Sequence, residues 1–276
     1  MNTDTLKSPK TIIVTGANGA IGKAISRQCA LKGYEVIMVC RNAQKAEAAK
    51  NEVILKVANP RVSVEIADLS RLSEIKELAA RIKKPVYALI NNAAATPLKR
   101  IETPEGLEIQ FATNILNYYW MSLAFHDHLK KGVSTFNEAR IVNVASFWAG
   151  DLELHDLQFK RRHYNNNTAY RQSKQAERML TVAFAEKFKS DCISVNSCHP
   201  GEVNSPLSNS MGFSGSHTPD RGAETPVWLA TSEINGTGKW FEYLQEQPCR
   251  FADDKTSIQK LYEICKEFSE GLSTHL

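Results

Sequence analysis

Short apolar runs rich in β-branched residues recur along the chain, and longer segments with a helical spacing of apolar positions separate them. Strands that are apolar throughout and alternate with helices are typical of a parallel sheet with helices on both faces. The pattern therefore predicts an α/β fold. The predicted strands are 11–16, 34–40, 62–69, 86–92, 139–146 and 192–200, and the predicted helices are 20–32, 43–57, 71–83, 105–130 and 169–189.

The size of the chain favours a single domain. Its 276 residues, 42% of them hydrophobic and 23% charged, suit one large domain with a full core better than two small ones. We expect a flexible N-terminus at 1–9 and one domain over 10–276, with a sheet of about seven strands.

Charge and cysteine content exclude several classes of protein. A net charge of +4 without basic blocks argues against a nucleic-acid partner. No stretch reaches the ~18 apolar residues of a membrane span, and the N-terminus lacks the apolar core of a signal peptide, so we expect no membrane anchor. Six cysteines without metal-ligand spacing favour reduced thiols, no metal site and a cytoplasmic location.

The turn after the first predicted strand reads TGANGAIG (15–22). Gly16 allows a tight turn, and Gly22 lets the following helix pack closely on the strand, so that a pyrophosphate can approach the helix N-terminus. A chance turn with three glycines is the alternative, because turns favour glycine. The position of the turn favours a Rossmann-type dinucleotide site, and its residues are Gly16, Asn18, Gly19, Ala20, Ile21 and Gly22.

The end of the second predicted strand indicates which dinucleotide binds. NAD sites place an acidic residue there for the ribose 2′-hydroxyl, whereas this chain has Arg41 and Asn42. Arginine suits a 2′-phosphate, so NADP(H) is favoured over NAD(H), although an ordinary surface arginine is the alternative. Asp68 and Leu69 end the third run, where the Asp68 carboxylate can accept from the adenine amino group.

Tyr170 and Lys174 lie four residues apart on one face of a predicted helix. The ordinary pKa of tyrosine, about 10, makes it a poor proton shuttle at neutral pH. A neighbouring ammonium and an oxidised nicotinamide both lower that pKa, so Tyr170 can exchange a proton with a carbonyl or alcohol oxygen. Taken alone, this spacing also occurs by chance on amphipathic helices.

Other motifs accompany this pair. Ser146 ends the fifth predicted strand, where its hydroxyl can hydrogen-bond a substrate oxygen. Asn114 lies in an apolar helical segment, where a buried amide needs a partner. The residues expected to flank the nucleotide and its nicotinamide end are Asn92, Ala93, Ala94, Pro200, Gly201, Val203 and Ser205.

Taken together, and in this order, these motifs resemble the short-chain dehydrogenase/reductase family over about residues 10–268. The resemblance implies an oxidoreductase with a small carbonyl or alcohol substrate. It implies that Tyr170 is the acid/base, and that Lys174 binds the nicotinamide ribose and lowers the tyrosine pKa. It further implies that Ser146 holds the substrate carbonyl and that Asn114 supports a proton relay through water.

Two departures from the family pattern concern the nucleotide. Ala20 and Ala94 stand where the family usually has glycine, and Ala20 adds a methyl group near the pyrophosphate.

The spacing T-G-x-x-G-x-x-G of the glycine turn is also that of another branch of the family, the sugar-nucleotide epimerases and dehydratases. That branch normally adds a C-terminal substrate domain, for which this chain has little room, and lacks the NNA and PG sequences found here.

A closer resemblance is to the retinol-dehydrogenase-like subgroup, on segments such as GLEIQFATNILNYYWMSLAF and TPDRGAETPVWLAT. Members usually carry an N-terminal membrane anchor, which we do not expect in this chain, and NILNYYW differs from the usual NHLGHF. A retinoid substrate is therefore not implied. The resemblance implies a lipophilic ketone, aldehyde or secondary alcohol.

The sequence also predicts a substrate lid and a homodimer. The Ser-, Gly- and Asn-rich segment 207–219 is predicted to be a substrate lid, with a plain surface connection as the alternative. Apolar residues on the helices 105–130 and 169–189 exceed one core-facing stripe and favour a homodimer. They include Trp120, Phe125 and Phe184.

A protein that senses NADP(H) without turnover is a competing function. The presence of Asn114, Ser146, Tyr170 and Lys174 together argues against it, because a sensor does not need this set.

Overall fold

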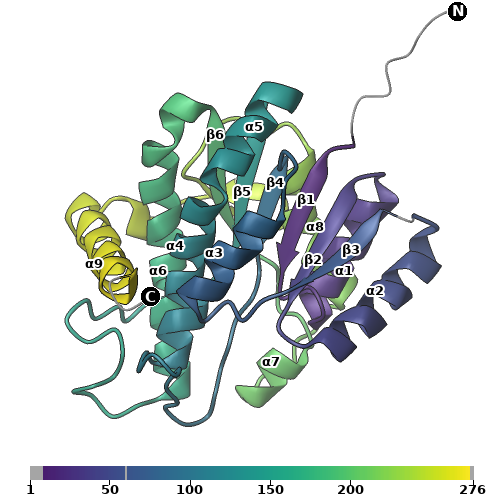
Figure 1. Ribbon diagram of the computed structural model, residues 1–276. Helices are drawn as coiled ribbons and strands as arrows, with labels where there is room; N and C mark the ends of the chain where they lie inside the picture. The colour runs from purple at the N-terminus through teal and green to yellow at the C-terminus, as the bar shows by residue number, and fades with distance from the viewer. Residues whose placement is uncertain (1–8, 60, 274–276) are drawn as a thin grey trace, which may run out of the picture.

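One eight-stranded sheet forms the centre of the protein in a computed structural model that describes residues 9–59 and 61–273 (Figure 1). The predicted flexible segment at 1–9 lies outside the described residues except for Pro9. The strand order is β3-β2-β1-β4-β5-β6-β7-β8, and only the pair β7–β8 is antiparallel. The bounds are β1 (Thr11–Thr15), β2 (Glu35–Cys40), β3 (Val62–Ile66), β4 (Ala88–Asn91), β5 (Ala139–Val144), β6 (Ile193–His199), β7 (Trp240–Glu242) and β8 (Gln245–Gln247).

Helices cover both faces of this sheet because its strands are apolar on both sides. Along β1, Ile13 packs into one buried cluster, while Ile12 and Val14 pack into the other. Helices α3 to α6 contribute to the first cluster, and α1, α2 and α8 to the second. The bounds are α1 (Ala20–Leu31), α2 (Ala43–Val57), α3 (Leu72–Arg81), α4 (Asn117–Ala124), α5 (His126–Phe136), α6 (Asn166–Lys187), α7 (Pro206–Ser210), α8 (Pro219–Thr231) and α9 (Lys255–Ser273).

The α/β fold and all six predicted strands are confirmed, whereas the helix predicted at 105–130 is wrong in its bounds and its continuity. A π-helical turn spans Phe111–Leu116 before α4, and Phe125 separates α4 from α5. The later start has a local cause. The Glu108 carboxylate accepts hydrogen bonds from the N–H groups of Gln110 (2.9 Å) and Phe111 (2.7 Å), which caps the helix there.

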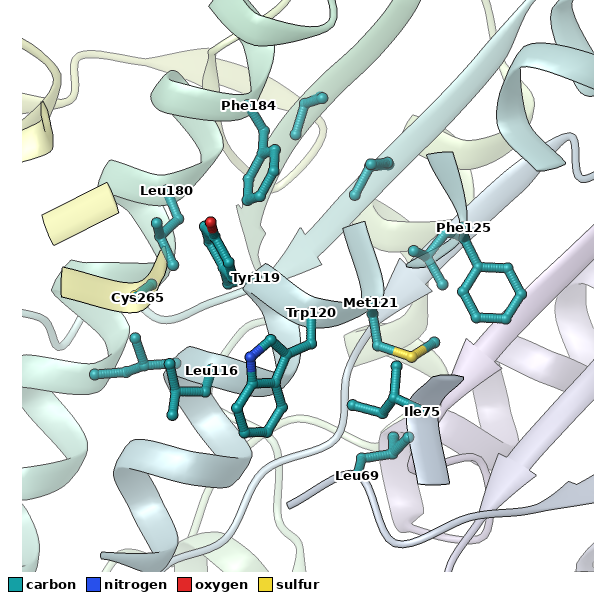
Figure 2. Close-up of a cluster of buried hydrophobic side chains, with 14 of the residues drawn as sticks. Leu69, Ile75, Leu116, Tyr119, Trp120, Met121, Phe125, Leu180, Phe184 and Cys265 are labelled. Carbon is teal, nitrogen blue, oxygen red and sulfur yellow. The ribbon is translucent and has the colours of Figure 1, made fainter. Parts of the chain in front are cut away.

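Helix α9 packs against α4 and α6 and buries the aromatic side chains between them (Figure 2). The ring of Tyr262 on α9 lies 5.1 Å from that of Tyr119 and 5.6 Å from that of Phe184. The Trp120 indole N–H donates to Ser269 Oγ at 2.7 Å. Together with the neighbouring helices, α9 thereby completes the core on the side of the sheet covered by α4 and α6.

This packing corrects the argument for a homodimer. Trp120, Phe125 and Phe184 are 2%, 0% and 1% exposed, so none of them lies on the surface of the folded chain. Helix α9, which the sequence pattern did not indicate, contacts Trp120 and Phe184, and Phe125 packs against His128 in the same core. The homodimer itself stays a prediction, now without this support.

The role of α9 can be tested at Leu261, which is fully buried on it. Leu261→Ala removes buried apolar atoms and should lower the free energy of unfolding by ~2–5 kcal/mol. Leu55→Ala, at a position that is 85% exposed, should change it by less than ~0.5 kcal/mol. Urea unfolding followed by circular dichroism measures both variants. Equal, small effects would mean that α9 is not part of the core.

Candidate active site

A cavity of about 370 Å³ lies at the carboxyl ends of the parallel strands, and Leu207 of α7 is among its lining residues. Figure 1 shows α7 at this edge of the sheet. In open α/β sheets this edge is where ligands bind. Most of the residues predicted for the cofactor line the cavity: Gly16, Asn18, Gly19, Ala20, Ile21, Gly22, Arg41, Asp68, Leu69, Asn92, Ala93, Ala94, Tyr170, Lys174, Pro200 and Ser205.

The glycine turn leaves no room for a side chain at two of its three glycines. Gly16 has φ +62°, and a Cβ there would lie 2.8 Å from Ala93 Cα. A Cβ on Gly22 would lie 2.3 Å from the Gly16 carbonyl oxygen. Helix α1 begins directly after Gly19, which has no side chain to cap it, so its first N–H groups suit an anion in the cavity. This cradle fits a dinucleotide pyrophosphate.

Asn92 fixes the turn from the neighbouring strand. Its Nδ2 donates to the Thr15 carbonyl oxygen at 2.8 Å, and its backbone N–H donates to the Thr15 hydroxyl, also at 2.8 Å. The end of β4 is thereby held against the end of β1. Asn92 thus lines the cavity and at the same time ties together two of the strand ends that form it.

The polar side chains at the ends of β2 and β3 differ in whether they are free to bind a ligand or already have a hydrogen-bond partner in the protein. Arg41 lines the cavity and is exposed, so its guanidinium is accessible to a phosphate. The Asn42 side chain instead accepts from the Lys45 N–H at 2.9 Å and caps α2, and Asn42 is not part of the described lining. Asp68 lines the cavity while accepting from the Ser70 hydroxyl at 2.8 Å.

Helix α6 carries Tyr170 and Lys174 into the cavity. Asn165 caps this helix through the Thr168 N–H, which sets its start one turn before Tyr170. The Lys174 ammonium nitrogen lies 5.4 Å from the centre of the Tyr170 ring and donates to the Val144 carbonyl oxygen at 3.2 Å. The Ser146 hydroxyl oxygen, two residues beyond β5, accepts from the Trp148 backbone N–H at 3.1 Å, and Ser146 is close enough to Tyr170 to lower the pKa of that tyrosine. Ser146 is not among the described lining residues.

Opposing effects set the pKa of Tyr170 in the protein without its cofactor. Burial raises it above the ordinary value of tyrosine, and this effect outweighs the lowering by the Lys174 ammonium and by the hydrogen bond from Ser146. Glu177 raises it further. Lys174 therefore acts in the predicted direction, and the lowering of the tyrosine pKa by Lys174 and an oxidised nicotinamide together stays a prediction.

Asn114 lies in the π-helical turn before α4, a local geometry that is frequent at functional sites. Its Oδ1 accepts from the Ala95 N–H at 2.8 Å, and its Nδ2 donates to the Ala95 carbonyl at 3.0 Å and to Ser173 Oγ at 3.2 Å. These bonds join the segment after β4 to α6. The cavity wall described here includes Thr113 but not Asn114, and the predicted water relay stays a prediction.

The turn after β6 contributes Pro200 and Ser205 to the cavity but neither Gly201 nor Val203 among the described lining residues. Gly201 has φ +94°, and a Cβ there would lie 2.6 Å from His217 Nδ1. Val203 is buried. Both therefore shape the turn from behind the cavity wall.

The structure adds lining residues that the sequence reading missed: Val39, Cys40, Ala67, Ala95, Thr113, Val144, Ala145, Pro206 and Leu207. Most of them directly precede or follow a predicted residue at a strand end. Their positions near strand ends could have indicated a place in the cavity wall. An apolar side chain at the end of a buried strand, however, is usually interpreted as part of the core.

Three further features of the described residues bear on function. No helix among them has the length and apolar character to cross a bilayer. No group of three or more His, Cys, Asp or Glu side chains among them could hold a metal ion. All six cysteines carry free thiols.

Comparison with known proteins adds an independent finding. The profile of a family described as short chain dehydrogenase matches residues 10–212. Retinol dehydrogenase 13 of Mus musculus is 32% identical, over 92% of this chain and 81% of that protein. Retinol dehydrogenase 11 of Homo sapiens is 31% identical, over 84% of this chain and 76% of that protein. A solved structure of an uncharacterised protein from Mycobacterium Paratuberculosis matches with a TM-score of 0.79 and 27% identity, over 95% of this chain and 93% of that chain.

Beside the cavity, His199 at the end of β6 is 4% exposed, and neither of its ring nitrogens has a hydrogen-bond partner. Burial, with smaller contributions from His217 and Arg178, lowers its pKa to about 3. An unfolded histidine has a pKa of about 6.5, so the unfolded chain binds more protons between these values. The contribution of the neutral, buried His199 to the free energy of unfolding should therefore be fully present above pH ~6.5 and be lost as the pH falls toward 3.

Replacing this histidine should remove part of the acid sensitivity. Between pH 7 and 5, the free energy of unfolding should fall by about 2 kcal/mol more in the unmodified protein than in His199→Gln. His163→Gln, at an exposed position, should keep the full loss. Urea unfolding at the two pH values measures the difference. An equal loss in His199→Gln would show that another group causes it.

Proposed function

The chain belongs to the short-chain dehydrogenase family, and on this premise we propose that it transfers hydride between NADP(H) and a lipophilic carbonyl or alcohol substrate. Family membership and relatives named retinol dehydrogenases make it an oxidoreductase on CH–OH or C=O groups with a nicotinamide cofactor. One observation carries the proposal. Tyr170 and Lys174 reach the same cavity that the glycine turn lines, and Ser146 lowers the pKa of Tyr170.

The proposed chemistry follows from these contacts. The Tyr170 hydroxyl gives its proton to the substrate oxygen in reduction and takes it back in oxidation, with Ser146 hydrogen-bonding the same oxygen. The Lys174 ammonium stabilises the phenolate that remains on Tyr170. A bound nicotinamide supplies or accepts the hydride at the carbon. The alcohol then carries the hydride on carbon and the tyrosine proton on oxygen.

The preference for NADP(H) rests on Arg41. It is an exposed arginine on the cavity wall at the end of β2, where an NAD site would have an acid. A guanidinium can donate two parallel hydrogen bonds to a phosphate. Asn42 does not compete, because its side chain caps α2.

The proposed lipophilic substrate rests on aromatic side chains beside Tyr170. The Trp148 ring lies 6.0 Å from the Tyr170 ring and makes an edge contact with Phe213 at 4.9 Å. Phe147 and Phe213 remain 49% and 46% exposed, although large apolar side chains are usually buried. An apolar substrate that covers these rings would remove that surface from water.

We propose that the segment 207–219 acts as the lid over this substrate. It includes Phe213, and the Leu207 side chain lines the cavity. The Ser210 hydroxyl lies 3.2 Å from that of Thr96, which connects α7 to the loop after β4. A cytoplasmic location belongs to the same proposal and is supported by the free thiols of all six cysteines.

The cofactor preference is tested by Arg41→Asp. The variant should bind NADPH more weakly, by a few kcal/mol at most, because a charge-assisted contact is replaced by repulsion, while NADH gains relative to NADPH. Arg61→Asp makes the same charge change at an exposed site outside the described cavity lining and should leave both affinities unchanged. Titration of nicotinamide fluorescence gives the dissociation constants. An Arg41→Asp protein with an unchanged ratio of NADPH to NADH affinity would show that Arg41 is only a surface charge.

Tyr170→Phe tests the acid/base. It removes only the hydroxyl, so folding and NADPH binding should survive while turnover falls by ~10²- to 10⁴-fold. Tyr34→Phe, at the opposite end of the strands, should turn over normally. A panel of aldehydes, ketones and alcohols with NADPH and NADP⁺, followed by nicotinamide absorbance, measures this. Near-normal turnover in Tyr170→Phe would exclude the mechanism, and tight NADPH binding without turnover on any substrate would favour the sensor.

A further inference from the structure

Glu177 lies one helical turn beyond Lys174 on α6 and is completely buried. Its two carboxylate oxygens accept from the Lys174 ammonium at 2.8 and 3.0 Å. The third acceptor of this ammonium is the Val144 carbonyl oxygen at 3.2 Å. An ammonium has three N–H donors, so these acceptors occupy all of them. A ribose hydroxyl can therefore bond Lys174 only by displacing one of these partners.

This carboxylate is an unusual component of an apolar interior. Burial raises the pKa of the Glu177 carboxyl, and Lys174 is the group that opposes this effect. Taking an ion pair out of water is costly, and replacing such a pair by apolar side chains is often neutral or stabilising. A gain in stability alone therefore does not account for this pair. Its position beside Tyr170 offers a different account.

We propose that Glu177 is a positioning residue of the active site, whose buried carboxylate holds the Lys174 ammonium and offsets part of the positive charge that Lys174 presents to Tyr170. The inference rests on the proposed role of Tyr170 as the acid/base. In the protein without cofactor, Glu177 keeps the proton on the Tyr170 oxygen more firmly than Lys174 alone would. A nicotinamide ribose that takes a donor from Glu177 then weakens this restraint, so the phenol becomes easier to ionise once cofactor is present.

The remaining ionisable groups around the pair do not supply the same effect. Tyr118 on α4 and Cys198 on β6 are both buried, and burial raises the pKa of each side chain above its ordinary value. Both are therefore neutral through the neutral range. The groups whose charges act on the pKa of Tyr170 are Lys174 and Glu177. Both Glu177 oxygens accept from the Lys174 ammonium, which is the geometry of an ion pair.

Glu177→Gln tests the proposal, because it keeps the size and one oxygen acceptor but removes the charge. The pKa of Tyr170 should fall by about one unit, because removing a nearby like charge has an effect of this order. The limb of the pH–rate profile that reports Tyr170 should move to lower pH by the same amount. In Glu177→Asp, which keeps the charge, it should lie close to the original position. Glu186→Gln, an exposed carboxylate on the same helix, should leave it unmoved.

A second readout does not depend on turnover. The ultraviolet absorbance of the Tyr170 phenolate is obtained in the cofactor-free protein as the difference between each variant and the same variant carrying Tyr170→Phe. If no substrate turns over, the proposed function fails, but this titration still measures the effect of Glu177. If the enzyme is active and the Tyr170 pKa is the same in Glu177→Gln as in the unmodified protein, the inference about Glu177 is wrong.

A paired comparison covers the case in which Glu177→Gln does not fold. Glu177→Asn and Glu177→Asp both shorten the side chain by one methylene, and only Glu177→Asp keeps the charge beside Lys174. The Tyr170 pKa should be lower in Glu177→Asn than in Glu177→Asp. Equal values would overturn the proposal, because the charge at position 177 would then have no effect on Tyr170.

Discussion

The burial of the Lys174 ammonium is the constraint on which the site depends. At 2% exposure it cannot be solvated by bulk water, so the protein must supply its acceptors. The carbonyl of Val144 at the end of β5 and the carboxylate of Glu177 do this. The same low-polarity surroundings that make the ammonium costly also strengthen its effect on Tyr170. Burial still raises the tyrosine pKa in the protein without cofactor, which makes the charges around Lys174 decisive for how readily Tyr170 ionises.

The sheet brings these groups to the nucleotide. In the order β3-β2-β1-β4-β5-β6, the chain runs outward from β1 in one direction and continues from β4 in the other. The strand order reverses between β1 and β4, so the connecting helices lie on opposite faces of the sheet on the two sides of this pair. The ends of these helices leave a crevice at the carboxyl edge of the sheet. Asn92 and Thr15 fix the two strand ends together there, and α6 brings Tyr170 across from β5. Residues as far apart in the chain as Gly16 and Leu207 thus share one cavity wall.

Strand positions and most cavity residues could be predicted because both depend on local signals. A buried parallel strand is apolar throughout, and its end is marked by the first polar or glycine residue. The missed parts have no such signal. Strands β7 and β8 have three residues each, too few for a periodic pattern, and α8 contains Pro226, which disrupts a helical reading. Glu177 reads as an ordinary solvated glutamate of an amphipathic helix, and only the packing of α6 on β5 and α4 shows that it is buried. The homodimer argument failed for the same reason, since the cover that α9 gives to α4 and α6 is a tertiary fact.

The central claim is that this cavity supports hydride transfer rather than nucleotide binding alone. The most direct test mixes the protein with NADPH that carries deuterium at the transferable position of the nicotinamide and with a lipophilic aldehyde, and analyses the alcohol by mass spectrometry. The account predicts one deuterium on the carbinol carbon of each alcohol molecule and none in reactions without protein. Bound NADPH that stays unoxidised across a range of carbonyl substrates, or an alcohol free of deuterium, would contradict it.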